Sequence, residues 1–480
     1  MSIAISYMRT MFKEGHAMSR LASKAHWPMF WSTELLVAFI CIPIFLGFGA
    51  ITHAAVYYVA TDGNDANPGT QELPWGTIGK CSSTLSPGDT CIIEDGIYRE
   101  DISISRSGSP ENPVTIIAKN KRQAVLYGTI SVPANFVRIV GVKVVMPSGS
   151  VRGIRVTGDY NEIRDCFITT DSSSLGLNNT AMGIGGSNNK AIGNYVEKTC
   201  FGYGLTGTNH LFESNEAFGL KLNGSCGDVD YMRFFGSNHI IRNNLFHGIN
   251  LSDVGSAHVD CFQTFDNGGP EYAIRNIVIE GNYCSDVAEG MMLEGKIYKQ
   301  SSGLMVRNNI FRRCGAWCVC LVDIADAHFY NNTCDTTSGL HGIWCRGNGN
   351  IATCEFKNNI IYGTGTLYGV FETAQIIDGT PEAPGKGNLL YQPGVIIKGF
   401  ADDIKNVDPL FLDVLNGDYR LKRGSPAIDS GVIILNWSSP KDKDGNVRPA
   451  GNGWDIGAYE FLDNVIYPSK PKGLRILEKN

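Results

Sequence analysis

The densest group of side chains capable of acid–base or metal chemistry lies between residues 221 and 294. Carboxylates bind hard cations, and histidine exchanges protons near neutral pH, so a segment such as His258-Val259-Asp260 could do either. The candidate catalytic residues are Lys221, His258, Asp260 and Glu294. The candidate ligand-binding residues are Tyr231, Arg233, Gln263, Trp344 and Arg346, and the candidate metal ligands are Asp228 and Asp230.

An internal repeat indicates how these residues are positioned. Short alternating apolar segments end in Asn at residues 194, 215, 243, 282, 308, 331 and 358, which lie 21 to 39 residues apart. That spacing is typical of one coil of a solenoid. Asn tolerates the left-handed conformation of a sharp turn, and Asn side chains stacked in successive coils can form a hydrogen-bonded ladder. The repeat therefore predicts an all-β parallel solenoid.

Period-2 alternation along the strands predicts which side chains face outward. If the apolar residues point inward, His258 and Asp260 share the outer face with Lys221 and Glu294 of the neighbouring coils. With strands ~4.8 Å apart, these groups would lie roughly 5 to 10 Å from one another. Strict alternation points Gln263 inward, so a bulge would be needed to turn it out. Scattered polar residues on such a face can equally be solvated surface.

The two ends of the chain carry a family resemblance. The motifs are YYVATDGND (57–65), PGT (68–70), PWGTI (74–78), SPGDT (86–90), DGIYRE (95–100), NVDPLF (406–411), DYRL (418–421), GSPAID (424–429) and DIGAYE (455–460). They resemble secreted bacterial right-handed parallel β-helix proteins, a group that includes polysaccharide lyases of the pectate-lyase and chondroitinase or alginate-lyase kind. The resemblance spans roughly residues 56 to 462. It implies a right-handed parallel β-helix, with an N-terminal helical cap near residues 75–86 and a C-terminal capping segment.

The implied domain plan is 1–55, a signal or membrane segment; 56–125, N-terminal cap and first coils; 126–400, β-helix repeats; 401–462, C-terminal cap; and 463–480, a tail. In the first part, Lys13, Arg20 and Lys24 precede an uncharged apolar run, residues 35 to 51, and Ala54-Ala55 supplies small residues for cleavage. This pattern favours export to the periplasm, the cell surface or the medium. A retained membrane anchor is the alternative.

Polysaccharide lyases imply a β-elimination on a uronate-containing polymer, in which a base takes the C5 proton and a cation neutralises the carboxylate. By that resemblance the base would be Lys221 or His258, the Ca²⁺ ligands would be Asp228, Asp230 and Asp260, and the uronate partner would be Arg233. Hydrolysis by Asp260 and Glu294 is an alternative, as is carbohydrate binding without catalysis. The chain lacks the Gly-His-Gly motif of polygalacturonases and any compact Asp-rich calcium motif in its coils.

Fourteen cysteines fit an exported protein with disulfides, and 13 of them follow the N-terminal segment. Cys81 and Cys91 flank a Pro-Gly-Asp turn and are the predicted pair. Cys314, Cys318 and Cys320 are close enough in sequence to suggest zinc, but they lie on an apolar strand pattern without a His pair. Buried thiols are the favoured interpretation.

Composition limits the partners. The net charge is -6 and the pI about 5.9, so the chain lacks the basic character of nucleic-acid-binding proteins. The family resemblance implies a polysaccharide ligand, and a monomeric state is expected. Two short acidic segments, Asp62-x-Asn64-Asp65 and Asp442-x-Asp444-Gly445, invite a calcium interpretation, but turn-forming Asx residues are favoured because neither continues into a full calcium loop.

Overall fold

The computed structural model describes residues 54–171, 179–220, 226, 228–249, 258–266, 269–295, 301–336, 341–346, 354–363, 371–372, 385–391 and 402–463. The predicted signal or anchor lies outside these ranges, apart from Ala54 and Ala55. Within them, no helix is both long enough and apolar enough to cross a membrane.

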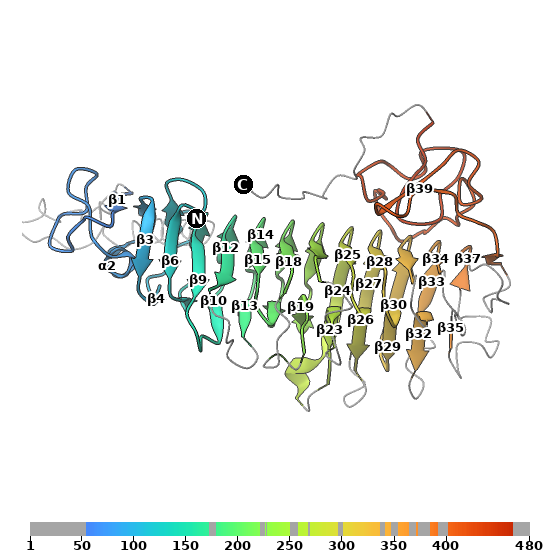
Figure 1. The fold of residues 1–480 in the computed structure, drawn as a ribbon, viewed down its shortest axis with the longest axis horizontal. Coiled ribbons are helices and arrows are strands. Elements are labelled where there is room, and N and C mark those ends of the chain that lie inside the picture. The colour runs from blue at the N-terminus through green and yellow to red at the C-terminus, as the bar shows by residue number, and fades with distance from the viewer. Residues whose placement is uncertain are drawn as a thin grey trace, which may run out of the picture. The chain divides into compact units, whose positions relative to one another are not determined.

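The chain from residue 54 onward winds through three parallel sheets, here called A, B and C, and each coil adds one strand to each sheet in that order (Figure 1). The winding is right-handed. Parallel pairing of successive coils follows from the repeat, because equivalent segments of each coil lie beside one another. The predicted all-β, right-handed parallel solenoid is confirmed.

In the described part of the chain, sheet A has 14 strands, sheet B 13 and sheet C 11. Sheet A contains β1 (Val56–Val59), β2 (Thr90–Ile93), β5 (Val114–Ala118), β8 (Val137–Val140), β11 (Glu162–Arg164), β14 (Lys190–Ile192), β17 (Leu211–Glu213), β20 (Gly236–Ser237), β21 (Ile240–Arg242), β24 (Ile274–Glu280), β27 (Ser302–Arg307), β30 (Ala325–Tyr330), β33 (Glu355–Lys357) and β36 (Gly385–Lys386). Sheet B contains β3 (Gly96–Arg99), β6 (Ala124–Tyr127), β9 (Lys143–Met146), β12 (Phe167–Thr170), β15 (Tyr195–Glu197), β18 (Glu216–Phe218), β22 (Leu245–His247), β25 (Tyr283–Ser285), β28 (Ile310–Arg312), β31 (Thr333–Asp335), β34 (Ile360–Tyr362), β37 (Leu389–Tyr391) and β38 (Ile404–Lys405). Sheet C contains β4 (Ile102–Ser103), β7 (Ile130–Val132), β10 (Arg152–Val156), β13 (Thr180–Ile184), β16 (Phe201–Leu205), β19 (Met232–Phe234), β23 (Asp260–Thr264), β26 (Glu289–Glu294), β29 (Trp317–Val322), β32 (His341–Arg346) and β35 (Phe371–Glu372).

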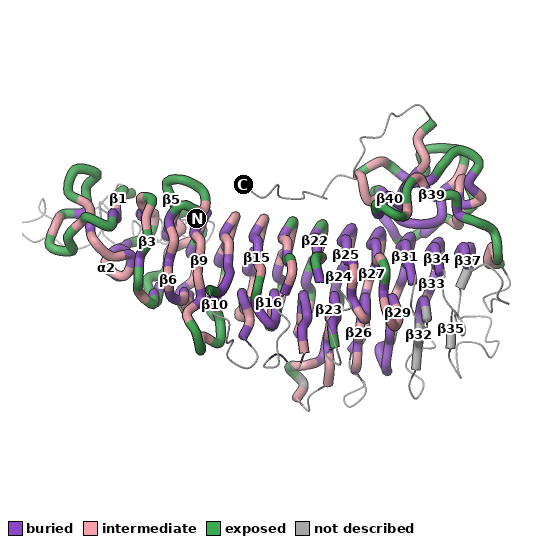
Figure 2. The backbone as a smooth tube through the Cα atoms, in the orientation of Figure 1, coloured by how far each residue is buried: buried purple, intermediate pink, exposed green. Residues whose placement is uncertain are grey.

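Buried residues recur along the strands of every coil (Figure 2), and their apolar side chains stack in columns inside the coils. On sheet A one column runs through Phe212, Ile241, Ile279, Val306 and Phe329, which pair in register from coil to coil and are fully buried. A residue at such a position packs against its equivalents in the coils on both sides. The register of the coils is therefore fixed by side-chain packing as well as by the backbone.

A ladder of asparagines runs along the turn between sheets A and B. Each backbone N–H at this position donates to the side-chain oxygen of the equivalent residue one coil on, at 2.8 to 3.0 Å. The members are Cys166, Asn194, Asn215, Asn244, Asn282, Asn309, Asn332, Asn359, Asn388 and Asp403. The predicted ladder is confirmed.

The left-handed turn residue and the ladder residue are neighbours, not the same residue. Asn243, Asn308, Asn331 and Asn358 have φ between 54° and 58°, and each is followed by a ladder asparagine. Gly281 takes the left-handed position before Asn282, with φ 65°. The Asn-Asn pairs of the sequence thus divide two tasks, a turn and a hydrogen bond, between two adjacent residues.

A second ladder precedes the strands of sheet A and changes residue type along its length. Asn161 N–H donates to the Asn189 side chain, Asn189 N–H to Nδ1 of His210, and His210 N–H to Nδ1 of His239. The two imidazoles stack with centroids 4.9 Å apart. Each Nε2 lies within hydrogen-bonding distance of a carbonyl oxygen, that of Thr206 or of Phe235. Because Nδ1 accepts, both rings are neutral and donate through Nε2.

At the N-terminal end, helix α2 (Ile78–Thr84) lies beside the first strands within the segment where a helix was expected. Thr77 begins it by accepting a hydrogen bond from Lys80 N–H, the usual role of an N-cap threonine. The other described helix is a short 3₁₀ turn, η2 (Pro270–Tyr272).

The C-terminal segment, residues 402–463, extends sheet B through β38 and carries a small antiparallel hairpin of β39 (Phe411–Asp413) and β40 (Asp418–Leu421). Its other contacts reach the A–B turns of the last coils and also sheet B, where the Tyr419 hydroxyl donates to Asp335. Arg448, fully buried, donates to Glu460, to Asn308 Oδ1 and to the Gly457 carbonyl. The segment therefore covers the flank of these coils in addition to extending the sheet.

Three disulfides occur in the described chain: Cys81–Cys91, Cys200–Cys226 and Cys261–Cys284. The first confirms the predicted pair. Cys314, Cys318 and Cys320 are buried thiols outside these disulfides, as the apolar pattern suggested.

The short acidic segments form turns. Asn64 Oδ1 accepts from Ala66 N–H, and Asp65 accepts from Gly76 and Thr77. Asp442 accepts from Asn446 N–H and side chain and from Glu460 N–H. Asn64 and Asp442 thus make the short-range contacts of Asx turns, whereas Asp65 joins its turn to the segment that begins helix α2.

Candidate acidic site on sheet C

Carboxylate side chains lie at or just before the start of three neighbouring strands of sheet C, β19, β23 and β26. Asp260, at the start of β23, pairs with Glu289, at the start of β26. Asp230 lies one coil earlier, where Tyr231 N–H donates to the Asp260 carbonyl. Asp228 forms a parallel bridge with His258 just before these strands. Parallel register therefore gathers carboxylates from three coils at one edge of the sheet.

The alternation of sheet C is interrupted at this point. Cys261 and Phe262 are consecutive and both fully buried in the core. Gln263 is then returned to the face of Asp260, three residues away, and its Nε2 donates to Asp260 Oδ2 at 2.9 Å. The register with β26 does not shift here, so the expected bulge is absent, and the break in alternation alone turns Gln263 outward and places its amide over the buried carboxylate.

The site has the geometry of a cation-binding site. One ligand atom from each of His258, Asp260 and Glu289 lies within 4.8 Å of the others, the single such group of three in the described chain. Calcium–oxygen distances of about 2.3–2.6 Å allow two ligands of one ion to be up to roughly 5 Å apart. Asp260 Oδ1, Glu289 Oε2 and Asp228 Oδ1 are buried oxygens without a hydrogen-bond partner. Such oxygens fit a divalent cation, because a buried polar atom is costly unless something satisfies it.

Arg233 holds the two earlier aspartates. Its Nε donates to Asp230 at 2.5 Å and its Nη2 donates to Asp228, while the guanidinium lies over the Phe201 ring, 4.0 Å from its centroid. This arrangement gives the arginine a positioning role beside the cluster. Arg233 donates to only one oxygen of Asp228, so Oδ1 of that residue is left without a hydrogen-bond partner.

Negative charge is in excess here. Burial, followed by neighbouring carboxylates, raises the pKa of Asp260 well above its usual value, and burial likewise raises the pKa of Glu289. Burial raises the pKa of Asp230 to about 7 although Arg233 opposes the shift. One guanidinium thus faces four carboxyl groups. A further positive charge would relieve this excess.

The other predicted site residues fall in different places. Tyr231 is a correction: its ring is fully buried and stacks on Phe246, so it is a core side chain and does not face the outer surface. Glu294 is half-buried at the far end of β26. Lys221 lies outside the described residues. Trp344 and Arg346 lie on strand β32, but their side chains lie outside the described part of the structure.

Glu289 was not among the predicted site residues, although a signal was present. Asp230, Asp260 and Glu289 are spaced 30 and 29 residues apart, and each is followed by a buried residue and then a Met or Phe of the core. Aligning coils on their carboxylates as well as on their asparagines would have found it.

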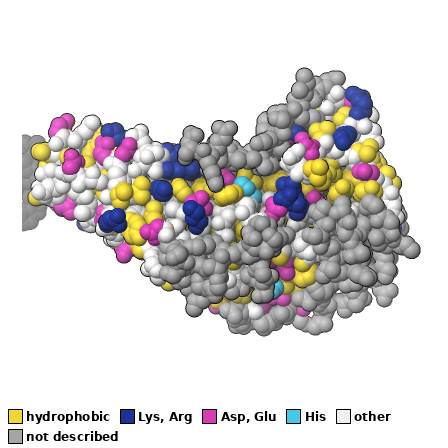
Figure 3. All heavy atoms as spheres, viewed as in Figure 1, with side chains coloured by type: hydrophobic (Ala, Val, Ile, Leu, Met, Phe, Trp, Pro, Cys, Tyr) yellow, Lys and Arg dark blue, Asp and Glu magenta, His cyan; other side chains and the backbone are white. Residues whose placement is uncertain are grey.

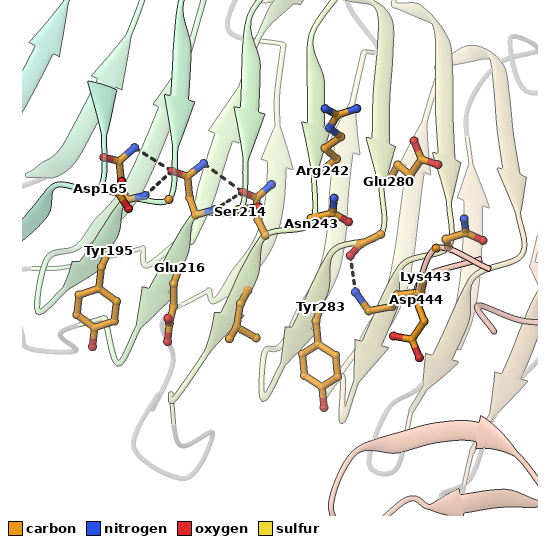
Figure 4. A pocket seen from close by; sticks show the side chains of 18 of the residues that line it. Asp165, Tyr195, Ser214, Glu216, Arg242, Asn243, Glu280, Tyr283, Lys443 and Asp444 are labelled. Carbon is orange, nitrogen blue, oxygen red and sulfur yellow. Dashed lines mark hydrogen bonds between the residues drawn. The ribbon is translucent and has the colours of Figure 1, made fainter. Parts of the chain in front are cut away.

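A cleft of about 760 Å³ lies elsewhere, where the A–B turns face residues 441–445 (Figure 4). Lys443 reaches into it and donates to the Gly281 carbonyl, and burial lowers the pKa of this lysine to about 8. The lining mixes Arg242 with Glu216 and Glu280 and contains none of the predicted site residues. The face shown in Figure 3 likewise intersperses charges of both signs.

The sheets, coils and ladder make this chain a right-handed parallel β-helix protein. Residues 57–234 match the family model of the Pel9A-like, right handed beta helix region. A stretch of 71 residues is 32% identical to the uncharacterized protein YwoF of Bacillus subtilis (strain 168), and it spans 15% of this chain and 15% of that protein.

Solved structures with the same kind of coil have low sequence identity to this chain. Pectate lyase Pel9A is 18% identical, with a TM-score of 0.46 over 86% of this chain and 97% of its own. A PL6 family polysaccharide lyase from Pseudopedobacter saltans is 14% identical, with a TM-score of 0.46 over 75% and 97%. An alginate lyase from Paenibacillus sp. str. FPU-7 is 12% identical, with a TM-score of 0.43 over 66% and 99%.

Proposed function

We propose that this chain is an exported enzyme that cleaves a uronate-containing polysaccharide by β-elimination, with Ca²⁺ held by the acidic site on sheet C. The observation that carries the proposal is the set of unpartnered buried oxygens on Asp228, Asp260 and Glu289. The match of residues 57–234 to the Pel9A-like coil supports the same conclusion. Three disulfides fit an oxidising compartment.

The carboxylates are the cation ligands in this proposal, because Ca²⁺ prefers oxygen over imidazole nitrogen. When bound, Ca²⁺ would neutralise the uronate carboxylate and so acidify the C5 proton. His258 is the candidate base. Its side chain is 66% exposed, at the rim of the site, and Nδ1 lies 3.9 Å from Glu289 Oε1. Lys221, the other candidate base, lies outside the described residues. Arg233 keeps Asp228 and Asp230 oriented.

Hydrolysis is disfavoured by the separation of both pairs of carboxyl groups. Glu294 lies opposite residue 265, five residues along the strand from Asp260, which is about 16 Å at ~3.3 Å per residue and too far for an acid and a base to act on one bond. Inverting glycosidases need about 6.5–9.5 Å between their two carboxyl groups, to leave room for water, and retaining ones about 5–5.5 Å. The ligand oxygens of Asp260 and Glu289 lie within 4.8 Å of each other. Such proximity suits a shared cation better than an acid and a base acting on opposite sides of a sugar.

The test combines activity with cation binding. The mature chain is incubated with pectate, alginate and other uronate polymers, and ultraviolet absorbance of the unsaturated product is recorded with chelator and after Ca²⁺ is restored. We expect activity that chelator abolishes, and Asp260→Asn and Glu289→Gln to lose it by roughly 100-fold or more. Glu162→Gln, on sheet A, is the matched control.

Calorimetric titration with Ca²⁺ tests the cation site independently of the substrate. The wild type should bind the ion and Asp260→Asn should not, whichever polymer is cleaved. If no polymer yields unsaturated product and neutral glycans yield no new reducing ends, the enzyme proposal fails and a binding protein remains. Full activity in chelator would refute the role of the cation.

A further inference from the structure

Three thiols meet in the interior of the last coils, away from the acidic site's outer face. Cys318 lies on β29 and Cys334 on β31, and Cys314 lies in the turn before β29. All three are at most 1% exposed. The Cys318 thiol is within hydrogen-bonding contact of both other thiols. The proposed function uses none of them.

Register relates this group to a disulfide two coils earlier. On sheet C, consecutive coils place Cys261, Gly290 and Cys318 at one interior position. On sheet B, consecutive coils place Cys284, Phe311 and Cys334 at one interior position. Cys261 and Cys284 are joined, with their Cα atoms 6.3 Å apart. Cys318 and Cys334 therefore occupy the same pair of positions, displaced by two coils.

The coil between them explains why the cross-link skips one turn. There the pair is Gly290 and Phe311, and a Cβ atom on Gly290 would lie only 2.8 Å from Cδ1 of Phe311. In this coil the Phe311 ring thus fills the space that the Cys261–Cys284 disulfide fills in the preceding coil. At this position the first coil joins sheets B and C by a disulfide, and the second packs an aromatic ring against a glycine. The third coil places two thiols in contact.

We propose that Cys318 and Cys334 form a fourth disulfide when the chain matures in an oxidising compartment. The two thiols lose two protons and two electrons as the S–S bond forms, and a partner disulfide of a thiol–disulfide oxidoreductase or of oxidised glutathione is reduced to two thiols. Cys334 is the partner of Cys318, rather than Cys314, because it reproduces the geometry of a pair already joined. A bond to Cys314 would span four residues, whereas the three disulfides of the described chain span 10, 23 and 26.

The test is a disulfide map of the full chain, produced by export into an oxidising compartment. The protein is alkylated with N-ethylmaleimide in denaturant without reductant and digested with chymotrypsin, which separates the cysteines by cutting after Phe311, Trp317, Leu321 and Tyr330. We expect a peptide joining residues 318–321 to the Cys334 peptide, two hydrogens lighter than its reduced parts and lost on reduction. Peptide 318–321 also contains Cys320, so the map is repeated with Cys320→Ser.

Variants provide the matched comparison. In Cys314→Ser the cross-linked peptide should persist, and in Cys334→Ser it should vanish and leave Cys318 open to alkylation. The wild-type map decides the question even if Cys334→Ser does not fold. A Cys314–Cys318 link, or full alkylation of all three cysteines, would overturn the proposal. The proposal would also be overturned if the cysteines resisted alkylation until a chelator was added and the peptide masses showed no disulfide, because that result indicates a bound metal. Cleavage activity does not enter this test, so the disulfide and the proposed function succeed or fail separately.

Discussion

Replacing Asn282 by Ala should destabilise the coil around it by about 3 kcal/mol. Its side-chain oxygen accepts from Asn244 N–H at 2.9 Å and from Asn244 Nδ2 at 2.8 Å. Its amide nitrogen donates to the Ile241 carbonyl at 3.0 Å and to Asn309 Oδ1 at 2.9 Å. The residue is 1% exposed, so water cannot replace these contacts in the folded state.

The size of the free-energy loss depends on which neighbouring groups still have a hydrogen-bond partner after the substitution. Asn244 Nδ2 still reaches the Phe212 carbonyl, and Asn309 Oδ1 still accepts from the backbone of residue 282. The Asn244 N–H loses its acceptor. One stranded buried donor costs about 1–3 kcal/mol, and the bonds lost elsewhere add roughly 1 kcal/mol.

The control is Asn243→Gly, at the adjacent left-handed residue with φ 57°. Glycine accepts this conformation, so the change should stay within about 1 kcal/mol. Urea unfolding followed by circular dichroism gives the free-energy change, and hydrogen exchange measured by mass spectrometry reports the Asn244 amide. We expect exchange there to rise on the order of 100-fold in the alanine variant. The reasoning is wrong if Asn282→Ala loses less than about 1 kcal/mol, or if Asn243→Gly loses as much.

Two further predictions concern buried charge. Burial, with a smaller effect of His210, lowers the pKa of His239 to about 4. Below pH 6.5 the unfolded chain therefore takes up a proton that the folded chain refuses, and about 2 kcal/mol of stability should be lost between pH 7 and pH 5. Asn occupies the equivalent position in earlier coils, so His239→Asn should reduce the change of unfolding free energy with pH, measured by urea titration. An unchanged pH dependence in this variant would contradict the prediction. Arg448→Met leaves Glu460 buried without its partner and should cost about 3–5 kcal/mol. Limited proteolysis should then cut residues 402–463 sooner, whereas Arg448→Met with Glu460→Leu should recover much of the loss.

The fold could be read from the sequence because a solenoid repeats its information. Each asparagine step marks one coil, and seven such segments agree on one geometry, so an error in any one of them matters little. The division between turn residue and ladder residue could not be assigned, because Asn243 and Asn244 are identical in type and either suits both tasks. Backbone conformation separates them.

The site was predictable only in part, because alternation was applied to a strand that breaks it. His258 and Asp260 do lie together, since they are close in sequence on one strand. Tyr231, a candidate ligand-binding residue, instead completes an aromatic stack in the core. Glu289 comes from another coil, and only the register of sheet C brings it to Asp260.

The asparagine ladder has an electrical direction. Every member from Asn194 to Asn388 gives its backbone N–H and one side-chain N–H forward, toward the next coil, and its other side-chain N–H back to a carbonyl of the preceding coil. Each side-chain oxygen accepts from the preceding coil, so the side-chain amide dipoles add along the ladder. At the far end Asn388 donates both its backbone and its side-chain N–H to Asp403. A carboxylate accepts without donating, and its negative charge suits the positive end of the row. Asp403 is thus a terminator, and any coil added by duplication would have to be inserted before it.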